Sequence, residues 1–362
     1  MSLRNLILLL IILGLPSCWS ESKNDMKQIL VEKDDPVDLY LSDISNEVET
    51  IILETDDSCL LSHIMKIEYS ENSIFIFDFR GPKVLQFSST GKFIKKIGSK
   101  GRGPGEYPNL RTFTIDGQNK LIYFATSKKL MCYDFSGTFI REIESNMLVE
   151  DMACLDNELK ILATEFGEKV ANGDFVNTKR LYIVDTNLVI TDSLLISRVY
   201  FKSLMGSDHP MPFLLSDVED GFYIYSPELL YEPFLRDTIY KVIDNELVPH
   251  TKYAFGSEKE LKDPKRSILI KNIYMSNRYT FLEFLYNHNS FFNLHDKESG
   301  GAWNMREGII DDIYNSGKVV LRPLEEKVDL FYFTKDAYGL EGIIDGIHEN
   351  DNPVLFLVKL KA

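Results

Sequence analysis

Residue types and spacings that commonly signal a metal centre or a hydrolase are missing from this chain. Its 362 residues include six histidines and four cysteines. No His-x-His, His-Glu-x-x-His or Cys-x-x-Cys spacing occurs, so the ligand patterns that usually hold zinc are absent. A Gly-x-Ser-x-Gly nucleophile elbow is also absent, which leaves a serine hydrolase without support. The sequence therefore predicts neither a metal ion nor a cofactor.

The few cysteines do not form a disulfide framework. They are Cys18, Cys59, Cys132 and Cys154, and an odd number remains once Cys18, which follows the N-terminal apolar run, is set aside. Cys132 lies in the strand-like run LMCY, so we expect a buried apolar thiol rather than a reactive one.

Basic residues are outnumbered in this chain. It has 40 Lys and Arg against 55 Asp and Glu, a formal net charge of −15 at pH 7, and no basic stripe. Because such a surface repels a polyanion, we expect no nucleic-acid partner. Hydrophobic residues make up 44% of the sequence, which is ample for a buried core.

One long apolar run stands at the start of the chain. Arg4 precedes residues 6–13, LILLLIIL, and the sequence LPSC follows at residues 15–18. A basic residue, a short apolar core and a small residue before a cleavage point are typical of a secretory signal peptide. The run is too short to cross a bilayer as a helix, which needs about 20 residues. We therefore predict a signal peptide over residues 1–17.

The end of this run resembles a bacterial lipobox. Leu15 stands three residues before Cys18 and Ser17 directly before it, whereas Pro16 departs from the usual pattern. The resemblance implies that the signal is removed before Cys18 and that this cysteine carries acyl chains, which anchor a protein to a membrane. Ordinary secretion with an incidental cysteine is the alternative. Residues 18–46 are largely polar, and we predict that they form a flexible tether between the acylated cysteine and a folded body.

A repeated pattern dominates the rest of the sequence. Residues 85–97 read LQFSSTGKFIKKI, and residues 131–143 read MCYDFSGTFIREI. Aromatic, glycine and isoleucine positions coincide in the two segments, and looser copies occur at residues 181–190 and 238–248. Short strands and turns that repeat at a spacing of about 46 residues predict a β-propeller.

We predict an all-β fold, a six-bladed β-propeller over residues 47–362. Six blades would average about 53 residues, and the later repeats are visibly longer than the first, which favours six blades over seven.

The strand pattern also predicts how the ring is built and closed. The apolar runs at residues 74–79, 121–124 and 221–225 are expected to be inner strands, covered by neighbouring blades on both faces. Residues 47–53 read as a strand that needs a partner. We expect this N-terminal strand to close the last blade by pairing with the long apolar strand at residues 354–360.

The segment between the first two repeats, GSKGRGPGEYP at residues 98–108, resembles the signature between blades of NHL-type propellers. That family carries Gly-x-Gly-Pro-Gly-Glu/Gln-Phe/Tyr followed by proline. The wider pattern is similar to the six-bladed β-propeller lipoproteins of Gram-negative gut commensals, through residues 54–55, 237–240 and 352–355. The resemblance implies a cell-envelope protein, lipid-anchored at the outer membrane on its periplasmic or surface face. It implies no particular activity.

Three residues at loops of this framework are candidates for ligand contact. The glycines of residues 98–108 do not match a phosphate-binding loop, because Glu106 stands where Gly-x-Gly-x-x-Gly needs its third glycine. We predict a structural turn, from which Arg102 can project toward a ligand. Asp78 and Arg80 end a predicted inner strand at the channel mouth, where a positioned arginine can bind a carboxylate. A blade-to-blade ion pair at the loop is the structural alternative.

Two further residues are candidate ligand contacts. His209 lies in the proline-bounded loop SDHPMP. The resemblance to NHL-type propellers makes His209 a candidate metal ligand, because related lyases hold a metal with channel histidines. Trp303 lies between Gly301 and Arg306 and could either stack on a sugar or fill a blade interface.

Taken with the missing catalytic patterns, these features favour a binding or interaction module over an enzyme. We expect a membrane-anchored, extracytoplasmic propeller whose loop face takes a glycan, a peptide or an envelope protein. The alternative is a metal-dependent lyase or a hydrolase that uses the propeller channel.

Overall fold

A computed structural model describes residues 26–70, 72–155, 157–202, 213–227, 235–256 and 267–361 of the chain. The predicted signal peptide, Cys18 and His209 lie outside the described residues. No helix within the described ranges is long and apolar enough to cross a bilayer.

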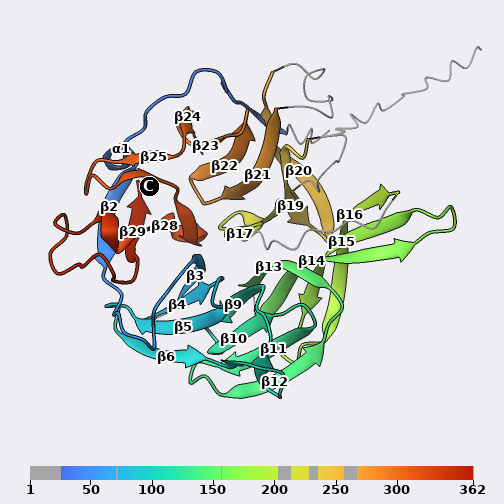
Figure 1. The fold of residues 1–362 in the computed structure, drawn as a ribbon. Coiled ribbons are helices and arrows are strands. Elements are labelled where there is room, and N and C mark those ends of the chain that lie inside the picture. The colour runs from blue at the N-terminus through green and yellow to red at the C-terminus, as the bar shows by residue number, and fades with distance from the viewer. Residues whose placement is uncertain are drawn as a thin grey trace, which may run out of the picture.

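Six sheets are arranged as the blades of one ring, and each contains four adjacent antiparallel strands (Figure 1). Among the described residues, two small two-stranded sheets lie outside the blades: β7 (Ser99–Lys100) with β8 (Glu106–Tyr107), and β25 (Ile309–Asp311) with β26 (Gly317–Val319). Blade 1 contains β3 (Ile64–Ser70), β4 (Ser73–Asp78), β5 (Lys83–Ser88) and β6 (Phe93–Ile97). Blade 2 contains β9 (Thr112–Asp116), β10 (Leu121–Ala125), β11 (Lys129–Asp134) and β12 (Phe139–Glu144). Blade 3 contains β13 (Leu148–Leu155), β14 (Glu158–Lys169), β15 (Phe175–Val184) and β16 (Ile190–Phe201). The predicted all-β, six-bladed propeller is confirmed.

The second half of the ring follows the same order from centre to rim. Blade 4 contains β17 (Leu215–Val218), β18 (Gly221–Ile224), β19 (Thr238–Ile243) and β20 (Glu246–Ala254). Blade 5 contains β21 (Ile268–Met275), β22 (Tyr279–Tyr286), β23 (Asn289–Asp296) and β24 (Ala302–Arg306). Blade 6 contains β27 (Arg322–Glu325), β28 (Leu330–Lys335), β29 (Val354–Leu360) and β2 (Ser45–Ile51).

The ring closes where the two ends of the chain meet in blade 6. Strand β2 pairs antiparallel with β29, and Val48 lies opposite Val358 in the register. Asn352, just before β29, supports the closure because its side chain donates to the Glu54 carbonyl at 2.8 Å and accepts from the Leu61 amide at 2.7 Å. The predicted closure by the N-terminal strand is therefore confirmed.

The repeated sequence segments are the outer half of each of the first two blades. Residues 85–97 cover β5, a turn and β6, and residues 131–143 cover β11, a turn and β12. Gly91 and Gly137 take φ of +82° and +85° at these turns, a conformation that favours glycine. At Gly91 a Cβ would also lie 2.1 Å from the Ile52 carbonyl oxygen, so the chain directly after β2 leaves no room for a side chain.

The strands predicted to be the inner strands are the second strands of their blades, counted from the channel. Residues 74–79, 121–124 and 221–225 coincide with β4, β10 and β18, which are the second strands of their blades. A second strand is paired along both edges and covered on both faces, so it is the most continuously apolar. The innermost strands are β3, β9 and β17, which border the channel and can carry charged side chains.

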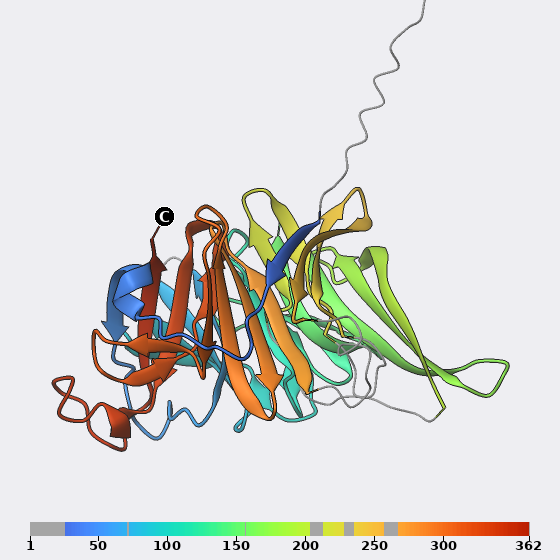
Figure 2. The same cartoon turned by 90° about the horizontal axis from the view of Figure 1, so that it is seen from above.

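The predicted flexible tether is wrong for residues 26–46. Strand β1 (Lys27–Leu30) pairs in parallel with β20 and adds a fifth strand to blade 4. Residues 26–44, here called the strap, then run along the rim past blade 5 to the short helix α1 (Leu41–Ile44) beside blade 6 (Figures 1 and 2). Ile29, Val31 and Leu39 are each no more than 4% exposed. These apolar residues, spaced along a polar segment, fix the strap to the ring.

The glycine-rich segment at residues 98–108 is a connection between blades. Strands β7 (Ser99–Lys100) and β8 (Glu106–Tyr107) pair in parallel and pinch the loop at its base. The Glu106 carboxylate accepts a hydrogen bond from the Gly103 amide at 2.9 Å and so occupies the interior of the loop. In this geometry the segment acts as a structural turn between blades 1 and 2.

Candidate functional site

A cavity of about 250 Å³ lies on the axis of the ring. Its walls come from the innermost strands of blades 1, 2, 3, 4 and 6 and from the 3-10 turn η1 (Glu326–Val328) that follows β27. The polar groups on its wall include Lys66, Glu68, Thr114, Asp151, Cys154, Asp217, Glu326 and Lys327. Ile67, Met152, Phe213 and Leu215 add an apolar part to the same wall.

Lys66, on β3, holds three blades together at the wall of this cavity. The side chain is buried, and its Nζ lies 2.9 Å from Glu68 Oε1 and 3.4 Å from Asp151 Oδ1. Nζ also donates to the carbonyls of Phe113 in blade 2, at 3.2 Å, and Met152 in blade 3, at 3.0 Å. Burial alone would lower the pKa of Lys66, but the two carboxylates outweigh it and hold the pKa above its ordinary value.

Asp151 carries the same connection onward to blade 4. Its Oδ1 accepts from the Met152 amide at 2.9 Å, and its Oδ2 accepts from the Leu214 amide at 2.8 Å, just before β17. With Lys66, this carboxylate joins the innermost strands of four consecutive blades. A buried, fully hydrogen-bonded ion pair of this kind fixes the geometry of the wall rather than reacting.

Glu68 and Glu326 are the cavity's unusual acids. Burial raises the pKa of both carboxyls, although Lys66 partly offsets the effect at Glu68. For Glu326 the nearby charges of Glu68 and Asp217 add to burial, and its pKa rises to about 8. Asp217 itself is paired with Lys327 Nζ at 2.6 Å. The cavity is therefore acidic overall and best suited to a group that donates hydrogen bonds or carries positive charge.

The cavity also contains a thiol, on Cys154. Burial raises the pKa of this thiol to about 12, with the negative charge of Asp116 adding to the effect. A thiol is a nucleophile only as its thiolate, so the environment holds Cys154 in an unreactive form.

The structure places most of the sequence-predicted site residues away from this cavity. Asp78 is fully buried at the end of β4, where it accepts from Ser62 Oγ at 2.7 Å and the His63 amide at 3.1 Å. Lys83, within the same blade, lies 3.6 Å from it. Asp78 thus holds the loop that enters blade 1, and its ion pair lies within that blade, whereas the structural alternative predicted one between blades.

The other described candidates are scattered over the rim. Arg80 is exposed in the turn after β4, and Arg102 is exposed in the loop between blades 1 and 2. Trp303 lies on β24, the outermost strand of blade 5, and its half-buried ring packs against the core shared with blade 6. None of these three lines the channel cavity. The structure does not bring the predicted candidates together.

The described histidines form no ligand cluster. In the ranges that the structure covers, no group of three or more His, Cys, Asp or Glu side chains is suited to hold a metal ion. His295 is buried on β23, and burial lowers its pKa to about 4. His209, the residue predicted with the metal alternative, lies outside the described residues.

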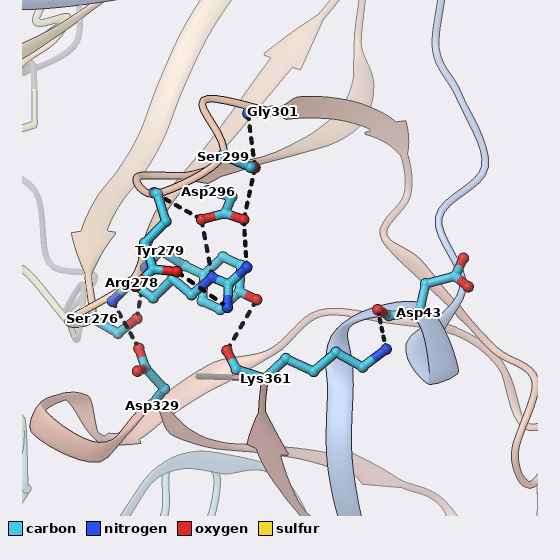
Figure 3. Close-up of polar contacts among 10 residues, drawn as sticks. Asp43, Ser276, Arg278, Tyr279, Asp296, Ser299, Gly301, Asp329 and Lys361 are labelled. Atoms are coloured by element: carbon cyan, nitrogen blue, oxygen red, sulfur yellow. Dashed lines mark hydrogen bonds and ion pairs between the residues drawn. The ribbon is translucent and has the colours of Figure 1, made fainter.

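A second polar cluster sits where blades 5 and 6 meet, and its contacts are structural (Figure 3). Arg278 donates to both oxygens of Asp296, from Nε at 3.0 Å and from Nη2 at 2.8 Å. This bidentate contact holds the pKa of Asp296 well below its ordinary value. The Arg278 amide donates to Asp329, and the Tyr279 hydroxyl donates to the Lys361 carbonyl at 3.2 Å. The cluster thus ties blade 5 to the C-terminal end of the chain.

Sequence reasoning missed the residues that line the channel. A signal was present in IMKIEYS at residues 64–70, where Lys66 and Glu68 interrupt an apolar run that precedes the second strand of the first repeat. Charged residues at alternate positions of a strand share one face of the sheet, and on the innermost strand of a blade that face borders the open channel as well as the next blade.

Taken together, these features define the class of the protein, a six-bladed β-propeller with a polar cavity at its centre. Residues 26–359 match the family model described as "Domain of unknown function (DUF4934)", and the chain belongs to this family. The match begins with the strap, which is therefore part of the family's domain. No curated protein matches the chain.

Two solved structures from Bacteroides are similar to it. A Bacteroides fragilis protein, described as a candidate exported protein, shares 19% identity at a TM-score of 0.65, over 93% of this chain and 100% of that one. A DUF4221 family member from Bacteroides vulgatus shares 12% identity at a TM-score of 0.45, over 88% of this chain and 99% of that one. The first likeness shows that the two proteins share a fold.

Proposed function

We propose that this protein is a lipid-anchored, extracytoplasmic binding module whose channel receives one group of a glycan, peptide or envelope-protein partner. The observation that carries the proposal is the axial cavity, which has acidic groups and an apolar side within one wall. Ligand sites in proteins combine these two elements: apolar surface for affinity and a few fixed polar groups for specificity.

The size and charge of the cavity limit what enters it. A volume of about 250 Å³ is below the range of about 300–1,000 Å³ usual for whole small-molecule ligands, so we expect one side chain or one sugar ring to enter while the rest stays at the mouth. Glu68 and Glu326 can accept hydrogen bonds from sugar hydroxyls or from an amine. The net charge of −15 further favours a neutral or cationic partner.

The N-terminal sequence supports the cellular location. Residues 1–18 have the pattern of a lipoprotein signal, and the similar Bacteroides fragilis protein is described as exported. The strap shortens the proposed link to the lipid, because β1 begins at Lys27, nine residues after Cys18. A chain of this length spans at most about 30 Å when fully extended, so the rim of blade 4 would lie close to the membrane.

Binding to the channel can be tested with defined glycan and peptide panels. We expect a ligand found this way to bind Glu68→Gln at least about tenfold more weakly, since the change removes an acceptor that can ionise. For Glu326→Gln we expect the same loss above about pH 8, where the wild-type carboxyl is ionised. Glu341→Gln, on an exposed loop of blade 6, is the matched control and should bind normally. If the channel variants keep full affinity while melting normally, the ligand binds elsewhere and the channel assignment is wrong.

Two further measurements test the lipid anchor and the enzyme alternative. Cys18→Ala should release the protein from membranes or leave the signal peptide uncut; acyl mass on the variant would contradict the anchor. Elemental analysis of the purified protein addresses the metal-dependent lyase or hydrolase. Stoichiometric zinc or calcium that is lost in His209→Ala would favour the enzyme over the binding module.

A further inference from the structure

The outer edges of most blades are protected against pairing with another strand. An open edge presents unpaired amides and carbonyls, and proteins usually cover it or place charges along it. In blade 4 the edge of β20 is covered by β1, and in blade 5 the strap bonds to the edge of β24 through Val37 N and the Asn304 carbonyl at 2.8 Å. Charged side chains mark the outermost strands of blades 1, 2 and 6: Lys95, Lys96, Arg141, Glu142, Glu144, Glu47 and Glu49.

Blade 3 is the exception. Its outermost strand, β16, has 12 residues with the sequence ITDSLLISRVYF, in which Asp192 and Arg198 are the only charged side chains. Together with β14 and β15 it extends beyond the ring as an arm (Figures 1 and 2). In the part of the chain that the structure describes, no strand pairs with its outer edge. A long, weakly charged strand rich in β-branched and aromatic residues is suited to strand addition.

The exposed apolar residues of β16 have a symmetric arrangement. Ile190, Leu195 and Tyr200 are 45%, 43% and 59% exposed. In the ladder with β15 they lie opposite Val184, Arg180 and Val176. These partners are four positions apart on one strand, so the three side chains share one face of the sheet. Two bulges in β16 maintain this spacing, and Leu195 is the midpoint of the set.

We propose that β16 pairs antiparallel with the β16 of a second copy of this chain, about a two-fold axis at Leu195. Leu195 then lies opposite Leu195 of the partner subunit, and Tyr200 lies opposite Ile190 of the partner subunit. The two sheets become one continuous sheet across the dimer. Because the contact is the same patch on both copies, it closes and leaves no further edge for a third copy.

The charges of the strand agree with this register. Because β16 has bulges, distances along it are counted by the partner residues on β15. Counted in this way, Arg198 and Ser193 lie equally far from Leu195 on opposite sides, and so do Asp192 and Val199. The two-fold axis therefore sets each charged residue opposite an uncharged one, and no like charges oppose each other, which would destabilise the pair. A foreign strand would not require a pattern symmetric about Leu195, and this symmetry is why we assign the edge to a second copy.

Sedimentation of the full-length protein in detergent tests the proposal. We expect a dimer at micromolar concentration, and Leu195→Lys should raise the dimer dissociation constant about tenfold or more, since it sets two like charges opposite each other. Ile94→Lys on β6, at a position 45% exposed, is the matched control and should leave the dimer intact. A monomeric wild-type protein, or a Leu195→Lys variant that dimerises normally, would overturn the proposal.

Crosslinking tests the register itself. In the proposed dimer, Leu195→Cys places two thiols across the axis within reach of a disulfide, and mild oxidation should give a covalent dimer. Ile94→Cys is the control for random collision and for the native cysteines. Covalent dimer at equal rates from the two variants would contradict pairing through β16, even if the protein is dimeric.

Discussion

Glu326 offers the sharpest test of the channel's electrostatics. Its carboxyl has an ordinary pKa of 4.5 and a pKa of about 8 in the fold, because burial and the charges of Glu68 and Asp217 disfavour its ionised form. Between these two pH values the folded protein binds a proton that the unfolded chain has lost. The contribution to stability is therefore complete below about pH 4.5 and is lost as the pH rises to about 8. Glu326→Gln, which stays neutral at every pH, should remove this loss.

The size of the effect follows from the two pKa values. At about 1.4 kcal/mol for each pH unit, the interval from 4.5 to about 8 gives a ceiling of about 5 kcal/mol. The Glu326 side chain is partly exposed, so water relieves some of the cost of its charge. We expect Glu326→Gln to be more stable than the wild-type protein by about 1–3 kcal/mol at pH 8.5 and equal to it at pH 4.5.

Urea unfolding at several pH values measures this directly. The wild-type free energy of unfolding should fall between pH 5 and pH 8.5 by more than that of Glu326→Gln, at an unchanged m-value. The neighbouring Glu325→Gln, at an exposed position, controls for the loss of one negative charge. An identical pH slope in the wild type and Glu326→Gln, or a variant destabilised at pH 8.5, would refute the reasoning.

Three further predictions concern the fold. His295 has an ordinary pKa of 6.5 and a pKa of about 4 in the fold, so it contributes stability above pH 6.5 that is lost as the pH falls to about 4. This loss is up to about 3 kcal/mol, and urea unfolding should show that His295→Gln removes it. Gly105→Val should lower the stability by about 1–3 kcal/mol more than Gly300→Val, as measured by thermal melting. Both glycines have positive φ, but a Cβ at Gly105 would lie 2.7 Å from the Phe139 ring, whereas a Cβ at Gly300 would contact nothing. Ile29→Lys should lower the free energy of unfolding by about 2–3 kcal/mol, whereas Leu30→Lys on the exposed face of β1 should not; equal melting of the pair would mean that the strap is not packed.

The propeller could be predicted because its signal is local and repeated. Residues 85–97 and 131–143 each encode two strands and the glycine turn between them, and both elements depend on backbone geometry that neighbouring residues dictate. Closure of the ring could be predicted for a similar reason, since residues 47–53 and 354–360 are strands that each need a partner. Blade register within residues 255–330 lacked such repeats and had to come from the structure.

The channel could not be predicted, because its contacts join residues that are distant in sequence. Lys66 and Asp151 are 85 positions apart, and nothing around either residue indicates that the ring brings them together. Asp78 shows the opposite error. Its position after a strongly apolar strand suggested the channel mouth, but that strand is the second of its blade, so the carboxylate turned inward to hold a loop.

The strap was misread because composition was given more weight than periodicity. Residues 26–44 are polar on average, yet Ile29 and Val31 are buried in the hydrophobic cluster of blades 3, 4 and 5, and Leu39 is buried in that of blades 5, 6 and 1. A few apolar side chains suffice in this segment, because the strap also gains backbone bonds along the β20 edge and at the Ile310 amide, which donates to the Leu39 carbonyl at 2.9 Å.

The strap also changes how the ring closure is protected. Strand β2, which closes blade 6, follows the strap in the chain, so a pull applied through the N-terminal segment reaches β1 before it reaches β2. Strand β1 lies parallel to β20 along four residues, and the side chains of Ile29 and Val31 pack on the same rim. Tension from the proposed anchor at Cys18 would therefore act on the strap first. The pairing of β2 with β29 then has only to close the ring and does not have to resist this pull.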